Sequence, residues 1–177
     1  MNISDRQKTY AAFAEITRKW VTVMDAKAGF LSALNGALLT FMWSGAKLGD
    51  VSSAVRCFAV SASALALLAL LASLWVIIPR EKLPAIFGKP VRWSASYKPF
   101  SFYGFIASNY EPDRFDQLEA ELEQLSDADF AQEALEQHFT ISRVARNKSV
   151  WITRAGYLSM VAIALVGVAL ILKMGGV

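Results

Sequence analysis

The stretch Cys57–Ile78 constrains the fold more than any other part of the sequence, because it carries no charged side chain and lies between Arg56 and Arg80. An α-helix rises about 1.5 Å per residue, so about 20 apolar residues cross the hydrocarbon core of a bilayer. A core helix of a soluble protein needs one apolar stripe, whereas this run is apolar on all its faces. We therefore predict that it forms a transmembrane helix.

Two other uncharged runs, Ala28–Ala46 and Ala155–Leu172, predict two further membrane helices. Asn35 is the one strongly polar side chain in the first of these runs. A membrane asparagine usually hydrogen-bonds to another helix, so we expect Asn35 to face protein and to link helices. A role of Asn35 in a pore or a proton path is the alternative.

The composition agrees with a membrane protein, because 55% of the residues are hydrophobic and only 19% are charged. The predicted fold is an all-α membrane protein with three transmembrane helices, of which the first and third extend into a cytoplasmic helical region. The predicted parts are a cytoplasmic amphipathic helix (1–27), a transmembrane hairpin (28–79), a cytoplasmic loop with helices (80–149) and the third transmembrane helix (150–172).

Positive charge indicates the orientation in the membrane. With three spans, the N-terminus and segment 80–149 share one side, and most membrane-flanking lysines and arginines lie there: Arg18, Lys19, Lys27, Arg80, Lys82, Arg143, Arg146 and Lys148. Positive side chains are retained on the cytoplasmic side, so we expect this side to face the cytoplasm. The net charge of +3 is small and gives no reason to expect a nucleic-acid partner.

The polar segments predict two amphipathic helices that run into the membrane without a break. The first, Ser4–Met24, carries an apolar stripe formed by Ile3, Tyr10, Phe13, Trp20 and Met24. We expect this stripe to pack on the chain itself or on a sister subunit, with contact to a lipid surface as the alternative. The second helix begins after Ser126, a cap with Asp127 and Asp129 in the first turn, and continues into the last span.

The sequence contains no pattern typical of an enzyme active site. The single histidine, His138, excludes a histidine-rich metal site, and the single cysteine, Cys57, excludes a disulfide framework. The acidic residues between Glu111 and Glu136 have the spacing of a solvated helix face. We therefore expect neither catalysis, nor a metal, nor a cofactor.

Charged side chains at the membrane entries of the first and third spans form the candidate ligand site. Both spans start from the same side, so their entries lie at the same level. The candidate residues are Arg18, Lys19, Asp25, Lys27, Arg143, Arg146 and Lys148. One interpretation is anchoring at the interface. The other is a basic ring that holds a small anion such as a phosphate.

Three motifs carry a resemblance to a known family. The junction Trp20–Leu39 contains D-A-K-A before the first span, Phe102–Ile106 reads F-Y-G-F-I, and Ile141–Trp151 is a basic entry into the last span. In this order they resemble the small transmembrane effectors of Pycsar anti-phage defence. The sequence departs from that pattern at Ser149, where the family resemblance leads us to expect an aromatic residue after the lysine.

The resemblance implies a bacterial inner-membrane protein that is inactive in an uninfected cell. A partner cyclase would make cyclic UMP or cyclic CMP on infection, and the effector would then impair the membrane and cause abortive infection. A pyrimidine ring requires an aromatic face or hydrogen bonds to its edge, and Trp93, Tyr97 and Tyr103 are the candidates for that contact. Three spans enclose too little for a wide pore, so we also expect a homo-oligomer.

Two other functions remain open from the sequence. The first is a membrane anchor whose cytoplasmic helices recruit a protein partner. The second is a constitutive small channel subunit, for which Asn35 is the only polar feature within a span.

Overall fold

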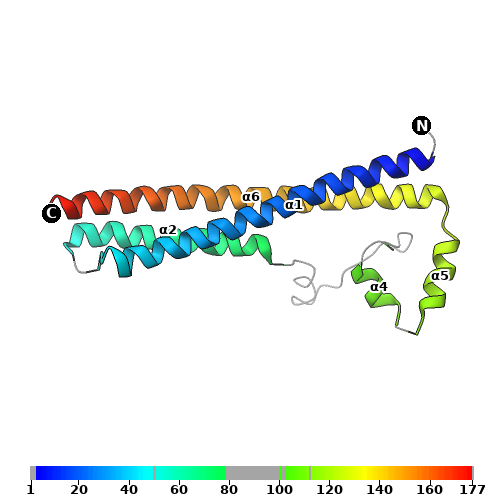
Figure 1. Cartoon of the computed structure of the whole chain (residues 1–177), viewed down its shortest axis with the longest axis horizontal. Helices are drawn as coiled ribbons and strands as arrows, with labels where there is room; N and C mark the ends of the chain where they lie inside the picture. Colours follow the sequence, from blue (N-terminus) through cyan, green and yellow to red (C-terminus); the bar gives the residue numbers. More distant parts are fainter. Residues whose placement is uncertain (1–2, 50, 79–99, 101–102, 112, 177) are drawn as a thin grey trace. The chain divides into compact units, whose positions relative to one another are not determined.

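The computed structural model describes residues 3–49, 51–78, 100, 103–111 and 113–176, and over these residues the chain is helical, with no strand. The elements are α1 (Ile3–Thr40), the π-helix η1 (Phe41–Gly45), α2 (Ser53–Ile77), α4 (Tyr103–Asn109), α5 (Phe115–Glu123) and α6 (Asp127–Met174) (Figure 1). The all-α class predicted from the sequence is confirmed. The single helix predicted from Ser126 through the last apolar run is confirmed as α6.

The chain divides into two compact units. The first comprises residues 1–19 and 79–143, and the second comprises residues 20–78 and 144–177. Because α1 and α6 are continuous, each of them contributes one part to the first unit and one part to the second.

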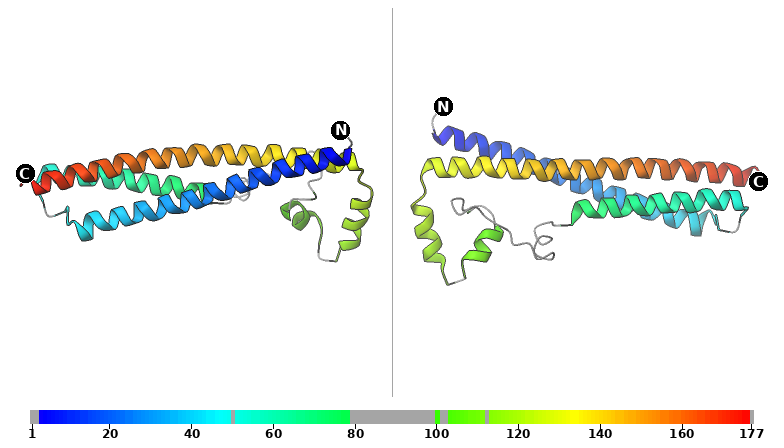
Figure 2. Two further views of the ribbon diagram at one scale, coloured as in Figure 1. Left: turned by 45° about the horizontal axis from the view of Figure 1, so that its top comes forward. Right: turned by 180° about the vertical axis from the view of Figure 1, so that it is seen from behind.

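In the second unit the later part of α1, helix α2 and the later part of α6 lie side by side (Figure 2). α1 and α6 run parallel here. Asp25 contacts Lys148, and Asn35, further along α1, contacts Ser159, further along α6. The contacts follow the same order along both helices, so the two helices run in the same direction.

Helix α2 runs antiparallel to α6. Its first turn contributes Val55 to the same apolar cluster as Val166, near the end of α6. At its other end Trp75 lies edge-on to Trp151, with ring centroids 6.5 Å apart. A short connection from α1 produces this hairpin, and the Ser52 side chain caps α2 by accepting a hydrogen bond from the Val55 N–H at 3.5 Å.

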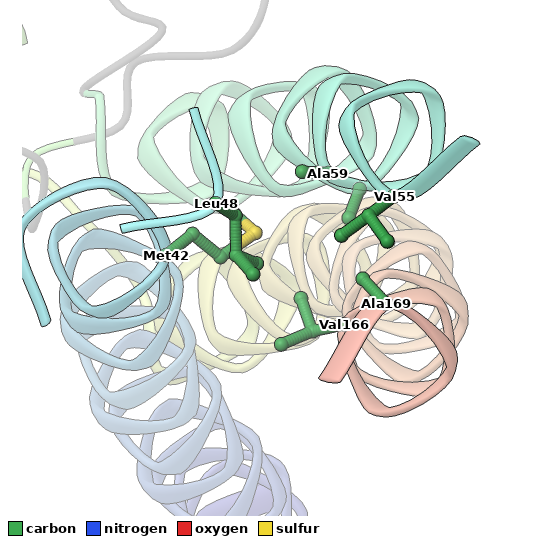
Figure 3. Packing of buried hydrophobic residues seen from close by; sticks show 7 residues of the cluster. Met42, Leu48, Val55, Ala59, Val166 and Ala169 are labelled. Atoms are coloured by element: carbon green, nitrogen blue, oxygen red, sulfur yellow. The ribbon is translucent and has the colours of Figure 1, made fainter. Parts of the chain in front are cut away.

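Small side chains form the interior of the second unit. Along α2 a series of buried residues at intervals of three and four consists of Val55, Ala59, Ala62, Ala66, Ala69, Ser73 and Val76, and Ala72 beside Ser73 is buried as well. The same spacing is found in α6 at Ala155, Ser159, Ala162, Val166 and Ala169. A repeat of about 3.5 residues is typical of supercoiled helices, and alanine in the seam lets backbones approach closely. Met42 of η1 and Leu48 of the following loop complete this core (Figure 3).

Two described helices, α2 and α6, are long and apolar enough to cross a membrane, judged by length and composition alone. Only 28% of the apolar window of each is buried inside the structure, whereas the core helix of a soluble protein is mostly buried. Large apolar side chains such as Leu71, Tyr157 and Ile171 are exposed instead. Contact with a lipid bilayer explains this exposed apolar surface, because exposure of apolar side chains to water is unfavourable and the acyl chains of the lipids would cover them.

The predicted first span, Ala28–Ala46, is divided in the structure. The α-helix ends at Thr40, and η1 continues the chain as a π-helix. Asp25 and Lys27 precede the run and Asn35 lies within it, so α1 is less apolar than α2 and α6. Of the three predicted spans, two are therefore identified by length and composition, and the first stays a prediction.

Only part of the apolar stripe predicted on the N-terminal helix lies on the face that packs on the chain, namely Tyr10 and Met24, which are half-buried. Phe13 and Trp20 are 47% and 58% exposed, whereas Ala14 is 2% exposed. The buried and half-buried face of α1 follows Ala14, Thr17, Val21, Met24 and Ala28. Small and weakly apolar side chains permit close helix packing but give little hydropathy signal, so the sequence pattern selected the bulky neighbours instead.

The first unit includes two short helices, α4 and α5. Tyr110, which follows α4, donates a hydrogen bond from its hydroxyl to Glu121 Oε2 of α5 at 2.7 Å. Burial raises the pKa of Tyr110 to about 12, and the hydrogen bond and negative charge of Glu121 act in the same direction. Phe105 of α4 is buried and lies edge-on to Tyr110, with ring centroids 6.3 Å apart.

Candidate functional site

An ion pair joins α1 and α6 where their charged segments give way to apolar ones. Lys148 Nζ donates a hydrogen bond to Asp25 Oδ1. The Lys148 side chain is 15% exposed and the Asp25 side chain is 39% exposed. A largely buried ammonium group requires such a partner, because desolvation disfavours an unpaired charge. The sequence analysis named both residues as candidates for a ligand site, and the structure shows that they bind each other.

The other lysines and one arginine of the predicted ring have solvent-accessible side chains. Lys19, Lys27 and Arg146 are exposed. None of the three forms an ion pair within the part of the chain that the structure describes. Their charges are therefore accessible to solvent, to lipid headgroups or to an anionic ligand.

Arg18 and Arg143, both in the first unit, already have partners. Arg18 Nη2 donates to Gln137 Oε1 at 3.0 Å, and its guanidinium lies 3.8 Å from Glu15 Oε2. The guanidinium of Arg143 lies over the ring of Phe139, 5.8 Å from the centroid, a cation–π geometry. An anion at either arginine would have to compete with these contacts.

The aromatic candidates fall largely outside the described residues. Trp93 and Tyr97 lie in segment 79–99, which is not among them. Tyr103 is the first residue of α4, but its side chain is likewise outside the described part. Their assignment to a pyrimidine ring stays a prediction.

Asn35 forms a second polar link between α1 and α6, deep in the apolar part of the second unit. It is fully buried, and its Nδ2 donates to Ser159 Oγ at 2.8 Å and to the Leu31 carbonyl at 2.7 Å. Ser159 Oγ in turn donates to the Ala155 carbonyl at 2.8 Å. Asn35 Oδ1 is buried and has no hydrogen-bond partner among the residues that the structure describes. Such an orphaned acceptor has a desolvation cost of about 1–3 kcal/mol.

Sequence reasoning missed the partners of these polar residues. Ser159 was treated as one residue of an apolar run. The position of His138 midway along a helix favours a surface or interhelical histidine, and the structure confirms an interhelical one: its Nδ1 lies 3.3 Å from Thr17 Oγ1 and its ring centroid lies 5.8 Å from that of Phe13. The spacing of these residues could have shown that they face α1. His138, Lys148 and Ser159 lie at three- and four-residue steps from one another and from the buried alanines of α6, so all of them share one helix face.

These contacts link α1 to α6 and leave exposed cations near the apolar segments. Among the described residues, no group of three or more His, Cys, Asp or Glu side chains is placed to hold a metal ion.

Comparison with known protein families shows a match that covers most of the chain. The Pycsar effector protein domain matches residues 9–173. The chain belongs to the Pycsar effector family. This matched range contains both polar links between α1 and α6, so both belong to the Pycsar effector domain itself. Family membership and the two apolar helices together indicate a membrane protein with a role in anti-phage defence.

Searches of curated proteins and of solved structures found no match to this Pycsar effector.

Proposed function

We propose that this protein is a bacterial inner-membrane effector that responds to cyclic UMP or cyclic CMP by impairing the membrane. The infected cell then stops growing before phage can spread. The observation that carries this proposal is the match of the Pycsar effector protein domain to residues 9–173. The nucleotide acts as a regulatory ligand, and the proposal includes no catalytic step.

Three spans complete the proposed topology. Helix α2 and the apolar part of α6 supply two spans, and Ala28–Ala46 supplies the third. The N-terminus and segment 80–149 then face the cytoplasm, where a cyclase product is available. The concentration of lysine and arginine on that side supports this orientation.

The resting state is held by the two polar links between α1 and α6. Asp25–Lys148 and Asn35–Ser159 keep the parallel helices in one register. A buried polar pair favours one register because any shift leaves its groups unsatisfied in an apolar surrounding. The ligand shifts the population toward a second arrangement of α1 and α6 only if it binds that arrangement more tightly than the resting one. Several subunits then act together on the bilayer.

Membrane potential in cells that produce the protein provides the test. Supplying cyclic UMP or cyclic CMP is expected to depolarise the membrane, and supplying cyclic AMP is expected to leave the potential unchanged. Depolarisation without any nucleotide would instead identify a constitutive channel. Unchanged potential with all three nucleotides, in cells where the protein is inserted, would contradict the proposal and favour a scaffold.

A matched control separates the nucleotide response from mere overproduction. Asn35→Leu removes the buried polar link without adding charge, and it is expected to depolarise cells at lower nucleotide concentration because the resting register is weakened. Cys57→Ser changes an exposed residue of α2 and is expected to respond as the wild type does.

A further inference from the structure

A small cavity in the first unit lies between the first turns of α1 and the first turns of α6. It has a volume of about 250 Å³. Arg6 and Tyr10 line it from α1, Gln132 lines it from α6, and Ala131 and Leu135 provide apolar wall. We propose that this cavity binds a small organic monoanion with one planar ring, the class to which a cyclic pyrimidine mononucleotide belongs. This inference rests on the proposed function in its choice of ligand.

Arg6 is the anion-binding group of the cavity. Its side chain is exposed, and it forms no ion pair within the described residues. A guanidinium presents coplanar N–H donors that match two oxygens of a phosphate. A cyclic phosphodiester carries one negative charge, so a single guanidinium neutralises it. The guanidinium of Arg18, in contrast, already donates a hydrogen bond to Gln137.

Tyr10 and Gln132 suit a pyrimidine base. Tyr10 is half-buried, so its ring offers a fixed apolar surface on which a planar base can stack. Gln132 Nε2 donates to Glu136 Oε1 at 2.7 Å. This bond orients the amide and leaves Gln132 Oε1 as an acceptor for the ring N–H of uracil or the amino group of cytosine.

The size of the cavity and its surrounding charges favour a mononucleotide. Sites for drug-sized ligands enclose about 300–1,000 Å³, and a cavity of about 250 Å³ lies near the lower end of that range, which suits a ligand of mononucleotide size. Asp129, in the first turn of α6, does not line the cavity, and its carboxylate accepts hydrogen bonds from the Ser126 hydroxyl and N–H. Arg6 is thus the one charged side chain that lines the cavity among the described residues.

Equilibrium binding to the full chain in detergent tests this site, with labelled cyclic UMP, cyclic CMP and cyclic AMP as probes. Arg6→Ala is expected to weaken binding of the pyrimidine nucleotide about tenfold to hundredfold, the usual effect of a lost charge-assisted contact. Tyr10→Ala is expected to weaken it at least several-fold, while Tyr10→Phe stays within about twofold because the ring remains. Arg6→Lys keeps the charge without the planar fork and is expected to fall between Arg6→Ala and the wild type.

Lys8→Ala is the matched control, because Lys8 is an exposed cation on the same helix that does not line the cavity. Circular dichroism of each variant shows whether its helices are intact. If the wild type binds and Arg6→Ala, Arg6→Lys and Tyr10→Ala bind equally well, the cavity is not the site, although the proposed function stands. If the wild type binds none of the three probes, both the site and the nucleotide trigger are overturned.

Discussion

Asp25 and Lys148 show how a single pair of residues can hold two helices in register. The pair lies where α1 and α6 become apolar, and the ammonium group is the more buried of the two partners. Its removal from water is offset only while the carboxylate accepts its hydrogen bond. Asn35 and Ser159 repeat this arrangement with neutral groups deeper in the same unit.

Reversing the ion pair tests this role. Asp25→Asn and Lys148→Met are each expected to destabilise the second unit by about 1–3 kcal/mol, because one polar partner is left unsatisfied. The double variant Asp25→Lys with Lys148→Asp is expected to recover at least half of the loss, because an opposite pair re-forms. Thermal unfolding in detergent measures all three.

Lys27→Met is the control for this series, since Lys27 is exposed and forms no ion pair among the described residues. A reversed pair, Asp25→Lys with Lys148→Asp, that is less stable than both Asp25→Asn and Lys148→Met would contradict the role of the ion pair in holding α1 on α6.

At the scale of elements, α6 begins with a reciprocal cap. Ser126 N–H and Oγ–H donate to Asp129 Oδ2 at 2.8 and 2.6 Å, and Asp129 N–H donates to Ser126 Oγ at 3.3 Å. These hydrogen bonds lower the pKa of Asp129 below the usual 3.8. The bond from the Ser126 hydroxyl has the larger effect, and the bond from the Ser126 N–H has the smaller one. Because the folded pKa is lowered, the cap stabilises α6 above the unfolded pKa and loses this effect as the pH falls through the folded value.

Ser126→Ala is expected to return the pKa of Asp129 toward 3.8, because both the hydroxyl donor and the cap geometry are lost. Amide protection in the first turn of α6 should then disappear at a higher pH than in the wild type. Carboxyl chemical shifts across a pH titration measure the first effect, and Ser149→Ala, an exposed serine within α6, is the control. An unchanged pKa of Asp129 in Ser126→Ala would contradict this account of the cap.

At the scale of the whole molecule, α1 has an apolar face that the chain itself does not cover. Phe13, Ile16, Trp20 and Val23 recur at intervals of three and four and are between 43% and 58% exposed. This is the spacing of a coiled-coil seam, and it repeats the spacing of the buried face beside it. The homo-oligomer predicted from the sequence stays a prediction, and this exposed face is where a second copy of the chain would pack.

Trp20→Glu is expected to convert the assembly to a smaller species, because a carboxylate in an apolar seam is strongly disfavoured. Light scattering in detergent measures the protein mass, and loss of depolarisation in cells should accompany the change. Phe115→Glu is the matched control, since Phe115 is 65% exposed on α5 and lies outside the seam. An unchanged mass in Trp20→Glu would exclude this face as the interface.

The sequence by itself determined the helical class, the long helix α6 and the apolar run of α2, because these depend on local composition and on helix capping. The sequence also showed that charged residues, among them Asp25 and Lys148, lie at the membrane entries of the first and third predicted spans. Only the tertiary structure decided that Lys148 binds Asp25 and that Asn35 binds Ser159, residues 123 and 124 positions apart. Their pairing depends on the register of α1 against α6, which is set by close packing of small side chains that carry almost no hydropathy signal.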